Sequence, residues 1–257
     1  MSDPVRLDVS AGIATITLAR PEKLNALDDV MVELLGRYAD AIDTDRSVRA
    51  VILTGEGEAF CAGGDIAAWG GLSPLDMGQG WVRSGHRVFD KLARMKPPVI
   101  AAMNGHALGG GLELAVTADI RICEAHAKIG LPECGLGMIP GWSGTQRLVR
   151  RLGASVARRL ALTGEMFTAD MALSLAVVDQ VVNKGTALSQ ARVVAERILT
   201  RGPVATFVVK QLINAAEDED RDAVMESLAS SLVSYTDDVK EGVTAFQEKR
   251  APRYQGK

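Results

Sequence analysis

Residues 97–119 read PPVIAAMNGHALGGGLELAVTAD and combine an apolar run, a turn, three glycines and one acidic residue. Residues 99–103 are a short, continuous apolar run of the kind that forms a strand buried on both faces, and Asn104-Gly105 then turns the chain. Three consecutive glycines follow at 109–111. Because glycine is a poor helix former, three together indicate a backbone that approaches a ligand closely with its N–H groups free. Residues 112–118 are predicted to form a helix, whose positive N-terminal end at the glycines favours an anion.

Glu113 lies in the first turn of this predicted helix, among apolar residues. Acidic side chains are common in first turns because they stabilise the helix dipole, so one interpretation of Glu113 is a solvated carboxylate. The apolar neighbours favour the other interpretation, a carboxylate inside a binding site built from the backbone. The position alone leaves both interpretations open.

An earlier segment has the same order of strand, glycines and helix. The chain opens with alternating apolar and polar residues at 5–18, which predict a hairpin, and a helix is predicted over residues 25–42. Residues 50–53 then form a buried strand, after which a pair of glycines at 63–64 precedes a helical turn at 65–66. Two such segments predict two backbone N–H donors.

Two loops rich in glycine and proline complete the main part of the chain. We expect a mobile loop at residues 69–80, close to any bound ligand. After a predicted strand at 120–123, residues 127–144 are expected to form a structured loop. Glu133 lies in this second loop with apolar neighbours, a setting that suits a surface carboxylate and a buried one equally well. A short strand is predicted at 177–182.

Beyond Pro203 the pattern is helical to the end of the chain, with apolar side chains at helical spacing. This tail is too small to form a core of its own, so we expect its apolar faces to cover the main domain or a neighbouring subunit. The sequence therefore predicts a main domain at residues 1–200 and a helical segment at residues 201–257.

The composition excludes several classes of protein. The chain has 257 residues, 47% of them hydrophobic, which is enough for one large core. A formal net charge of −3 without a basic run argues against nucleic acid as a partner. Without a signal peptide or an apolar run of roughly 20 residues, we expect a cytoplasmic protein and no membrane partner. The three cysteines and three histidines lack the spacing of a disulfide framework or a metal site, so we expect no metal.

Two common kinds of site fail on spacing. The sequence contains neither GxGxxG after a strand nor GxxxxGK followed by Ser or Thr, so these nucleotide-binding motifs are absent. Residues 141–145, GWSGT, approach the GxSxG motif of serine hydrolases, but Thr145 occupies the last glycine position. All three histidines also precede Ser143, whereas α/β-hydrolases place the histidine after the nucleophile.

The two glycine turns and the two carboxylates suit one kind of chemistry. Two N–H groups aimed at one oxygen form an oxyanion hole, which stabilises the charge on a thioester or carbonyl oxygen when the neighbouring carbon gains or loses a proton. Two close carboxylates in a poorly solvated pocket resist ionising together, so one holds a proton while the other accepts one. The addition of water needs both states at once.

Several segments in the same order resemble the enoyl-CoA hydratase/isomerase, or crotonase, family. They are residues 20–27 (RPEKLNAL), 59–66 (AFCAGGDI), 97–119 and 139–148 (IPGWSGTQRL), and residues 245–250 are similar to the family's last helix. The resemblance covers nearly the whole chain. It implies an α/β fold, a spiral of ββα repeats with a C-terminal helical trimerisation segment. It also implies a homotrimer or a dimer of trimers, and an acyl-CoA thioester as substrate without a separate cofactor.

Carried over residue by residue, the resemblance implies roles for individual positions. The oxyanion-hole N–H groups fall on Gly64 and Gly110. Glu113 would activate the water that attacks Cβ, and Glu133 would deliver the proton to Cα. The implied contacts to CoA and the acyl group fall on Lys23, Ala26, Cys61, Ala62, Gly63, Gly64, Asp65, Ile66, Gly109, Gly110 and Trp142. The implied reaction is the reversible syn addition of water to a trans-2-enoyl-CoA, which gives a 3-hydroxyacyl-CoA.

The sequence departs from the family pattern at two informative positions. Ala67 stands where many hydratases have a lysine that contacts CoA. Trp142 replaces a small residue, and its side chain either enters the acyl pocket or packs into the core. Three alternatives stay open at this point: an enoyl-CoA isomerase, a hydratase-lyase with retro-aldol cleavage, and a catalytically silent subunit that binds acyl-CoA.

Overall fold

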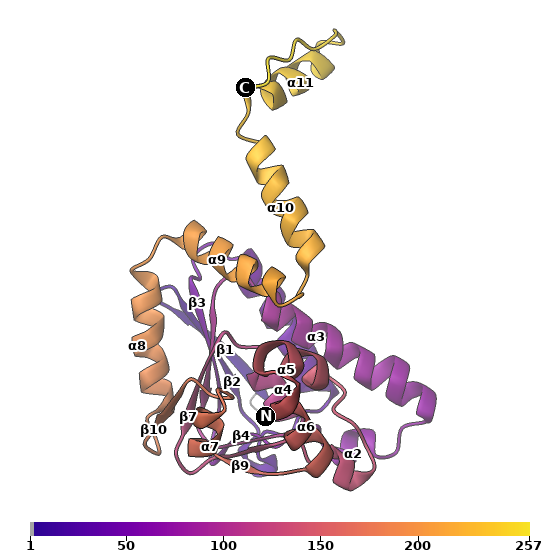
Figure 1. Ribbon diagram of the computed structural model, residues 1–257, viewed down its shortest axis with the longest axis vertical. Coiled ribbons are helices and arrows are strands. Elements are labelled where there is room, and N and C mark those ends of the chain that lie inside the picture. Colours follow the sequence, from indigo (N-terminus) through magenta and orange to yellow (C-terminus); the bar gives the residue numbers. More distant parts are fainter. Residues whose placement is uncertain (1–2) are drawn as a thin grey trace. The chain divides into compact units, whose positions relative to one another are not determined.

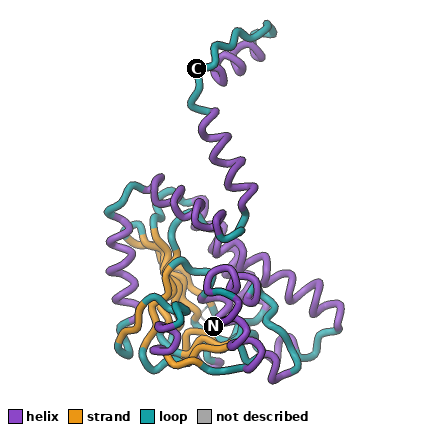
Figure 2. The backbone as a smooth tube through the Cα atoms, viewed as in Figure 1, coloured by secondary structure: helices purple, strands orange, loops and turns teal. Residues whose placement is uncertain are grey.

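The computed structural model describes residues 3–257, which divide into two compact units. The first unit runs to Lys210 and contains every strand described, drawn in orange in Figure 2. The second unit, Gln211–Lys257, contains α10 (Arg221–Val233) and α11 (Asp237–Gln247) (Figure 1). The division between the units falls inside α9 (Pro203–Ala216), the helix that Pro203 begins.

The larger sheet has six strands in the order β1-β2-β3-β5-β7-β10. The hairpin prediction is confirmed, because β1 (Val5–Ser10) and β2 (Ile13–Leu18) pair antiparallel. The later neighbours all pair in parallel, and their bounds are β3 (Ala50–Gly55), β5 (Val99–Met103), β7 (Ile120–Glu124) and β10 (Gln180–Val182). The last strand is shorter than predicted, because the buried Val177 and Val178 lie in a bend before it.

The smaller sheet has four short strands in the order β4-β6-β8-β9, with the bounds β4 (Ala59–Cys61), β6 (His106–Leu108), β8 (Lys128–Gly130) and β9 (Phe167–Thr168). The first three run parallel, and each follows a strand of the larger sheet: β4 follows β3, β6 follows β5 and β8 follows β7. Each of these strand pairs leads into helical structure, which produces the predicted ββα spiral. The sequence did not reveal the short strands, because three residues show no readable alternation.

Helices in the first unit differ from prediction mainly at their starts. The first begins at Asp29, not Asn25, since Asp28 caps it by accepting a hydrogen bond from the Met31 N–H. Residues 112–118 were also misplaced, because α4 is Gly110–Ala115 and includes two of the glycines. The bounds are α1 (Asp29–Thr44), α2 (Ile66–Trp69), α3 (Arg83–Arg94), α5 (Gly144–Leu152), α6 (Ala154–Thr163), α7 (Ala169–Ser174) and α8 (Ala187–Leu199).

The two predicted loops contain regular structure. Trp69 ends α2, and a π-helical segment, η2 (Asp76–Val82), runs directly into α3, so residues 69–80 are only partly a loop. The second loop, residues 127–144, contains β8 and a 3₁₀ turn, η3 (Glu133–Leu136). A further 3₁₀ turn, η1, spans Pro21–Lys23. Short helical segments therefore fix the positions of part of the side chains in both predicted loops.

Alternation along the strands divides the buried side chains of the larger sheet into two groups. One group, including Val51, Leu53, Ala101 and Met103, joins the main core with the smaller sheet, α1 and α3. The other group, Ala50, Ile52, Ile100, Ala102 and Ile122, packs on the alanines at 187, 191 and 195 of α8 (Figure 1). The central strands are thus buried on both faces, as their continuous apolar runs predicted.

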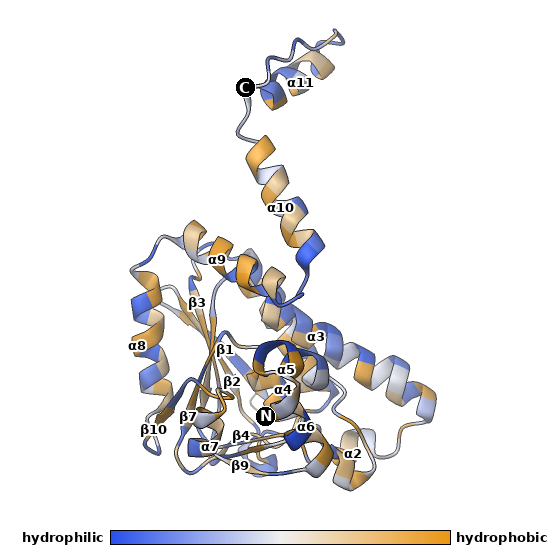
Figure 3. Cartoon of the chain, in the orientation of Figure 1, coloured by the Kyte–Doolittle hydropathy of each residue, from blue (hydrophilic) through white to orange (hydrophobic). Residues whose placement is uncertain are grey.

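The second unit exposes many large apolar side chains. They are Leu212, Ile213, Met225, Leu232, Val233, Tyr235, Val243, Phe246 and Tyr254. The orange stretches on α10 in Figure 3 show the same apolar character. Across residues 3–257, none of the helices combines the length and the apolar character that a membrane span requires.

Candidate active site

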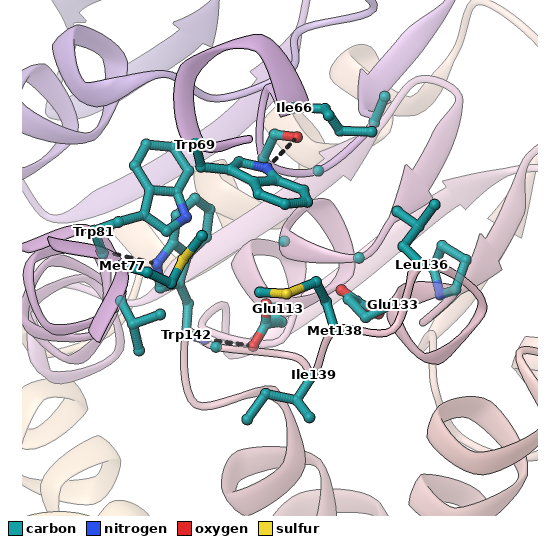
Figure 4. Close-up of a pocket in the computed structure, with 18 residues that line it drawn as sticks. Ile66, Trp69, Met77, Trp81, Glu113, Glu133, Leu136, Met138, Ile139 and Trp142 are labelled. Atoms are coloured by element: carbon teal, nitrogen blue, oxygen red, sulfur yellow. Dashed lines mark hydrogen bonds between the residues drawn. The ribbon is translucent and has the colours of Figure 1, made fainter. Parts of the chain in front are cut away.

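The parallel strands of the smaller sheet place the candidate site. Their carboxyl ends lie at one edge, because parallel neighbours end on the same side of a sheet. Gly64 follows β4, Gly110 follows β6 and Glu133 follows β8, and all three line one pocket (Figure 4). Glu113 reaches the same pocket from α4. The ββα spiral therefore brings together residues that lie far apart in the chain.

Gly64 and Gly110 provide two backbone N–H groups at the pocket wall. A methyl group on Gly110 would lie 3.4 Å from the nitrogen of Gly64, so the two turns approach each other closely. Gly110 opens α4, where N–H groups have no acceptor within the helix. In the part of the chain that the structure describes, neither N–H donates to a protein oxygen. Both groups are therefore available to an oxygen atom of a ligand.

Glu113 is a buried carboxylate, with only 2% of its surface exposed, so the solvated interpretation is wrong. Its Oε1 accepts hydrogen bonds from the N–H groups of Trp142 and Gly144, both at 2.7 Å. Burial raises the pKa of Glu113 to about 7, the hydrogen bond from Trp142 opposes the rise, and the nearby charge of Glu133 adds to it. Glu113 is thus able to exchange a proton near neutral pH.

Glu133 is half-buried at the start of η3. Its Oε2 is buried and, among residues 3–257, has no hydrogen-bond partner. A methyl group on Gly109 would lie 2.6 Å from Oε1, which places this carboxylate beside the turn that carries Gly110. Burial raises the pKa of Glu133 as well. Because ionisation of one carboxylate disfavours ionisation of the other, the pair tends to hold one proton, and its apparent pKa values belong to the pair.

All three tryptophans of the chain line the pocket: Trp69 in α2, Trp81 in η2 and Trp142 before α5. Trp142 satisfies both of its interpretations, since it is 3% exposed and also forms part of the pocket wall. Trp69 and Trp81 were not among the predicted site residues. The sequence feature that could have pointed to them is the glycine-rich segment between them, which was predicted to lie close to a ligand but not to contain helical structure. The other pocket residues that were not predicted are Met77, Val82, Pro132, Leu136, Met138, Ile139 and Gly141.

The remaining predicted contacts divide into two groups. Those that line the pocket are Ala62, Gly63, Gly64, Ile66, Gly109, Gly110 and Trp142, whereas Lys23, Ala26, Cys61 and Asp65 do not. Asp65 caps α2 through the Ala67 N–H and pairs with Arg20 at 2.8 Å, so it has a structural task. Cys61 is buried in β4, and burial raises the pKa of its thiol to about 12.

Ser143 lies beside a histidine and an aspartate, although chain order had argued against a hydrolase. Its Oγ is 2.8 Å from Nε2 of His86, and the same nitrogen lies 3.6 Å from Asp90. In a hydrolytic triad the aspartate binds the other ring nitrogen. Ser143 is also 3% exposed and does not line the pocket. Its left-handed φ of 70° instead turns the chain where the flanking N–H groups reach Glu113.

A metal site is not found among residues 3–257, where no group of three or more histidine, cysteine or acidic side chains is arranged to hold an ion.

The fold and the pocket define an enzyme of the enoyl-CoA hydratase/isomerase family. The model of that family matches residues 8–257, so the chain belongs to it, and the predicted crotonase-like fold is confirmed. It is 40% identical over 249 residues to the short-chain-enoyl-CoA hydratase of Clostridium acetobutylicum, covering 96% of this chain and 95% of the relative. It is 39% identical over 252 residues to the crotonyl-CoA hydratase of Syntrophomonas wolfei subsp. wolfei, covering 96% of each. The crystal structure of enoyl-CoA hydratase from Bacillus anthracis has a TM-score of 0.81 and 35% identity, covering 99% of this chain and all of that one.

Proposed function

We propose that the protein is an enoyl-CoA hydratase, which adds water reversibly and syn to a trans-2-enoyl-CoA and gives a 3-hydroxyacyl-CoA. One observation carries the proposal: a buried and a half-buried carboxylate share a pocket with two backbone N–H groups that have no protein acceptor among the described residues. The names of the two hydratase relatives support the same reaction.

The two N–H groups would bind the thioester oxygen. When water adds at Cβ, negative charge moves through Cα onto this oxygen, and an enolate forms. Hydrogen bonds from Gly64 and Gly110 stabilise that charge more than they stabilise the neutral thioester. In comparable sites each such donor lowers the activation barrier by roughly 3 kcal/mol.

The two glutamates would manage the protons. Two N–H donors favour the ionised form of Glu113, which takes a proton from water as the water oxygen bonds to Cβ. The unpartnered Oε2 of Glu133 favours its protonated form, which gives a proton to Cα. The step leaves Glu113 protonated and Glu133 ionised, so proton exchange with solvent resets the pair. The proposed step needs no metal or redox cofactor, because Gly64 and Gly110 stabilise the developing charge and the two glutamates exchange both protons.

Two further contacts are proposed: one between the exposed side of the pocket and the CoA portion of the substrate, and one between the C-terminal helices of several copies of the chain. The CoA portion would extend past residues 61–66 toward Lys23 and Ala26, although those two residues lie outside the pocket itself. The exposed apolar side chains of the second unit support self-association through the helical segment 201–257, as a trimer or a dimer of trimers. Acyl-CoA binding and catalysis are then assigned to residues 1–200.

Hydration of crotonyl-CoA tests the proposed function directly. We expect purified protein to remove the absorbance of the conjugated enoyl thioester and to form a product heavier by one water. An isomerase would give a product of unchanged mass, and a hydratase-lyase would give two smaller products. If neither crotonyl-CoA nor other 2-enoyl-CoA thioesters react while acyl-CoA still binds, the protein is a silent binding subunit.

The pH dependence of kcat/KM tests the glutamate pair. Below the acidic limb both carboxyls hold protons and Glu113 cannot accept another; above the alkaline limb both are ionised and Glu133 has none to give. We therefore expect a bell-shaped profile. Since burial raises the pKa of both carboxyls, both limbs should lie above the ~4.3 of an exposed glutamate. A profile that stays flat from mildly acidic to mildly alkaline pH, with chemistry rate-limiting, would contradict paired roles.

A further inference from the structure

The candidate pocket has one exposed side and one buried side. Ile66 and Leu136 are 55% and 60% exposed, whereas Trp81 and Trp142 are 8% and 3% exposed. Figure 4 shows the two pairs on opposite sides, with Glu113 and Glu133 between them. A ligand therefore enters past Ile66 and Leu136, and its inner end meets the two indoles.

Trp142 is held firmly at this inner end. Its Nε1 donates to the carbonyl oxygen of Trp81 at 3.3 Å, and its ring lies 5.0 Å from the ring of Trp81 and 5.1 Å from that of Phe89. Behind it, α3 approaches so closely that a methyl group on Gly85 would overlap the indole nitrogen. The indole consequently has no room to move away from the pocket when a ligand enters.

The thioester has only one suitable orientation in such a pocket. Its oxygen lies at Gly64 and Gly110, and the large, charged CoA portion has to stay on the exposed side, because burying unpaired charge is costly. The acyl chain then points inward, to where a methyl group on Gly110 would lie 2.8 Å from Cζ3 of Trp142. The cavity is about 120 Å³, well below the roughly 300–1,000 Å³ of pockets that hold drug-sized ligands.

We propose that the indole of Trp142 forms the inner end of the acyl subsite and restricts the enzyme to short-chain 2-enoyl thioesters. This inference rests on the proposed hydration activity and adds the class of acyl group to it. Trp142 acts by volume alone, because the hydrogen bond to Glu113 comes from its backbone N–H and survives substitution of the side chain.

The test compares kcat/KM for crotonyl-CoA and trans-2-decenoyl-CoA. We expect the native protein to favour crotonyl-CoA by about tenfold or more, and Trp142→Ala to shift the ratio toward decenoyl-CoA by about tenfold or more. Trp142→Leu should shift the ratio in the same direction. Because leucine fills more of the space than alanine, this variant keeps the test valid if Trp142→Ala does not fold. Gly85→Ala should act in the opposite sense, because its methyl group pushes the indole into the pocket.

Phe167→Leu is the matched control, since Phe167 is a fully buried aromatic residue of β9 that does not line the pocket. It should lower stability and leave the ratio unchanged. If the native protein uses both lengths equally, or both folded Trp142 variants keep the native ratio, the proposal is overturned. If no enoyl-CoA reacts, the proposed function fails; the acyl subsite is then judged from the Kd values of butyryl-CoA and decanoyl-CoA, which Trp142→Leu should bring closer together.

Discussion

Glu113→Gln should lower kcat for the proposed hydration by about 10²–10⁴-fold, the usual contribution of a general base. Glutamine has nearly the same shape as glutamate, and its side-chain oxygen still accepts the N–H groups of Trp142 and Gly144. It cannot take a proton from water. The loss should appear in kcat and in kcat/KM alike, because the missing interaction belongs to the transition state. Steady-state and single-turnover kinetics with crotonyl-CoA measure it.

The stability of this variant separates a catalytic loss from a folding loss. Because the folded protein raises the pKa of Glu113 to about 7, the contribution of Glu113 to the free energy of unfolding falls as pH rises from ~4.3 through 7. Glutamine does not titrate, so Glu113→Gln should be at least as stable as the native protein at pH 8. Urea unfolding at pH 5 and pH 8 measures this.

Two further variants complete the test. Glu196→Gln changes an exposed glutamate of α8 and should leave kcat unchanged. The double variant Glu113→Gln with Glu133→Gln should cost about as much as either single change, because groups that act as a unit are not additive. Wild-type kcat in folded Glu113→Gln would remove Glu113 from the mechanism.

Gly111→Ala should have the largest effect of any single added methyl group. Its Cβ would overlap the carbonyl oxygen of Cys61, a backbone atom of β4 that cannot rotate away. To relieve the overlap, α4 and β4 have to separate. Overpacking of this kind costs roughly 1–3 kcal/mol and sometimes more. We therefore expect a clear decrease in the urea midpoint.

Activity should fall more than stability does. Gly110 precedes Gly111 and Gly64 follows Cys61 closely, so separating α4 from β4 moves the two N–H donors apart. Loss of one oxyanion donor costs about 10²–10³ in kcat. The matched control is Gly71→Ala, whose methyl group would meet open space and should change stability by no more than about 0.5 kcal/mol. Native kcat in Gly111→Ala would show that the two turns do not depend on this close approach.

The sequence predicted the parts of the fold that carry long patterns. The hairpin and the strands at 50–53, 99–103 and 120–123 are confirmed, because their apolar runs are long enough to read. The smaller sheet was missed, although its strand ends carry the site. Strands as short as β6 depend on their neighbours for hydrogen bonds, and no local pattern records a neighbour.

The site shows the same limit. Gly64, Gly110, Glu113 and Glu133 were found through motifs, and the structure places all four at one pocket. Their roles in catalysis stay predictions. Trp69 and Trp81 were missed because this glycine-rich part of the chain was predicted as a loop, whereas α2 and η2 are helical and place the two indoles in the pocket wall. The contact between Ser143 and His86 joins residues 57 positions apart, which only the folded chain reveals.

Because Gly85 packs closely against Trp142, the substitutions that evolution can accept at one of these positions depend on the residue at the other. While the indole is present, any side chain at Gly85 meets it, so substitutions there are harmful. Once residue 142 becomes small, the same substitutions at Gly85 become neutral or fill the vacated space. With the proposed acyl subsite, a lineage that gains longer acyl groups has to change Trp142 first, and a later side chain at residue 85 would make the return to tryptophan difficult.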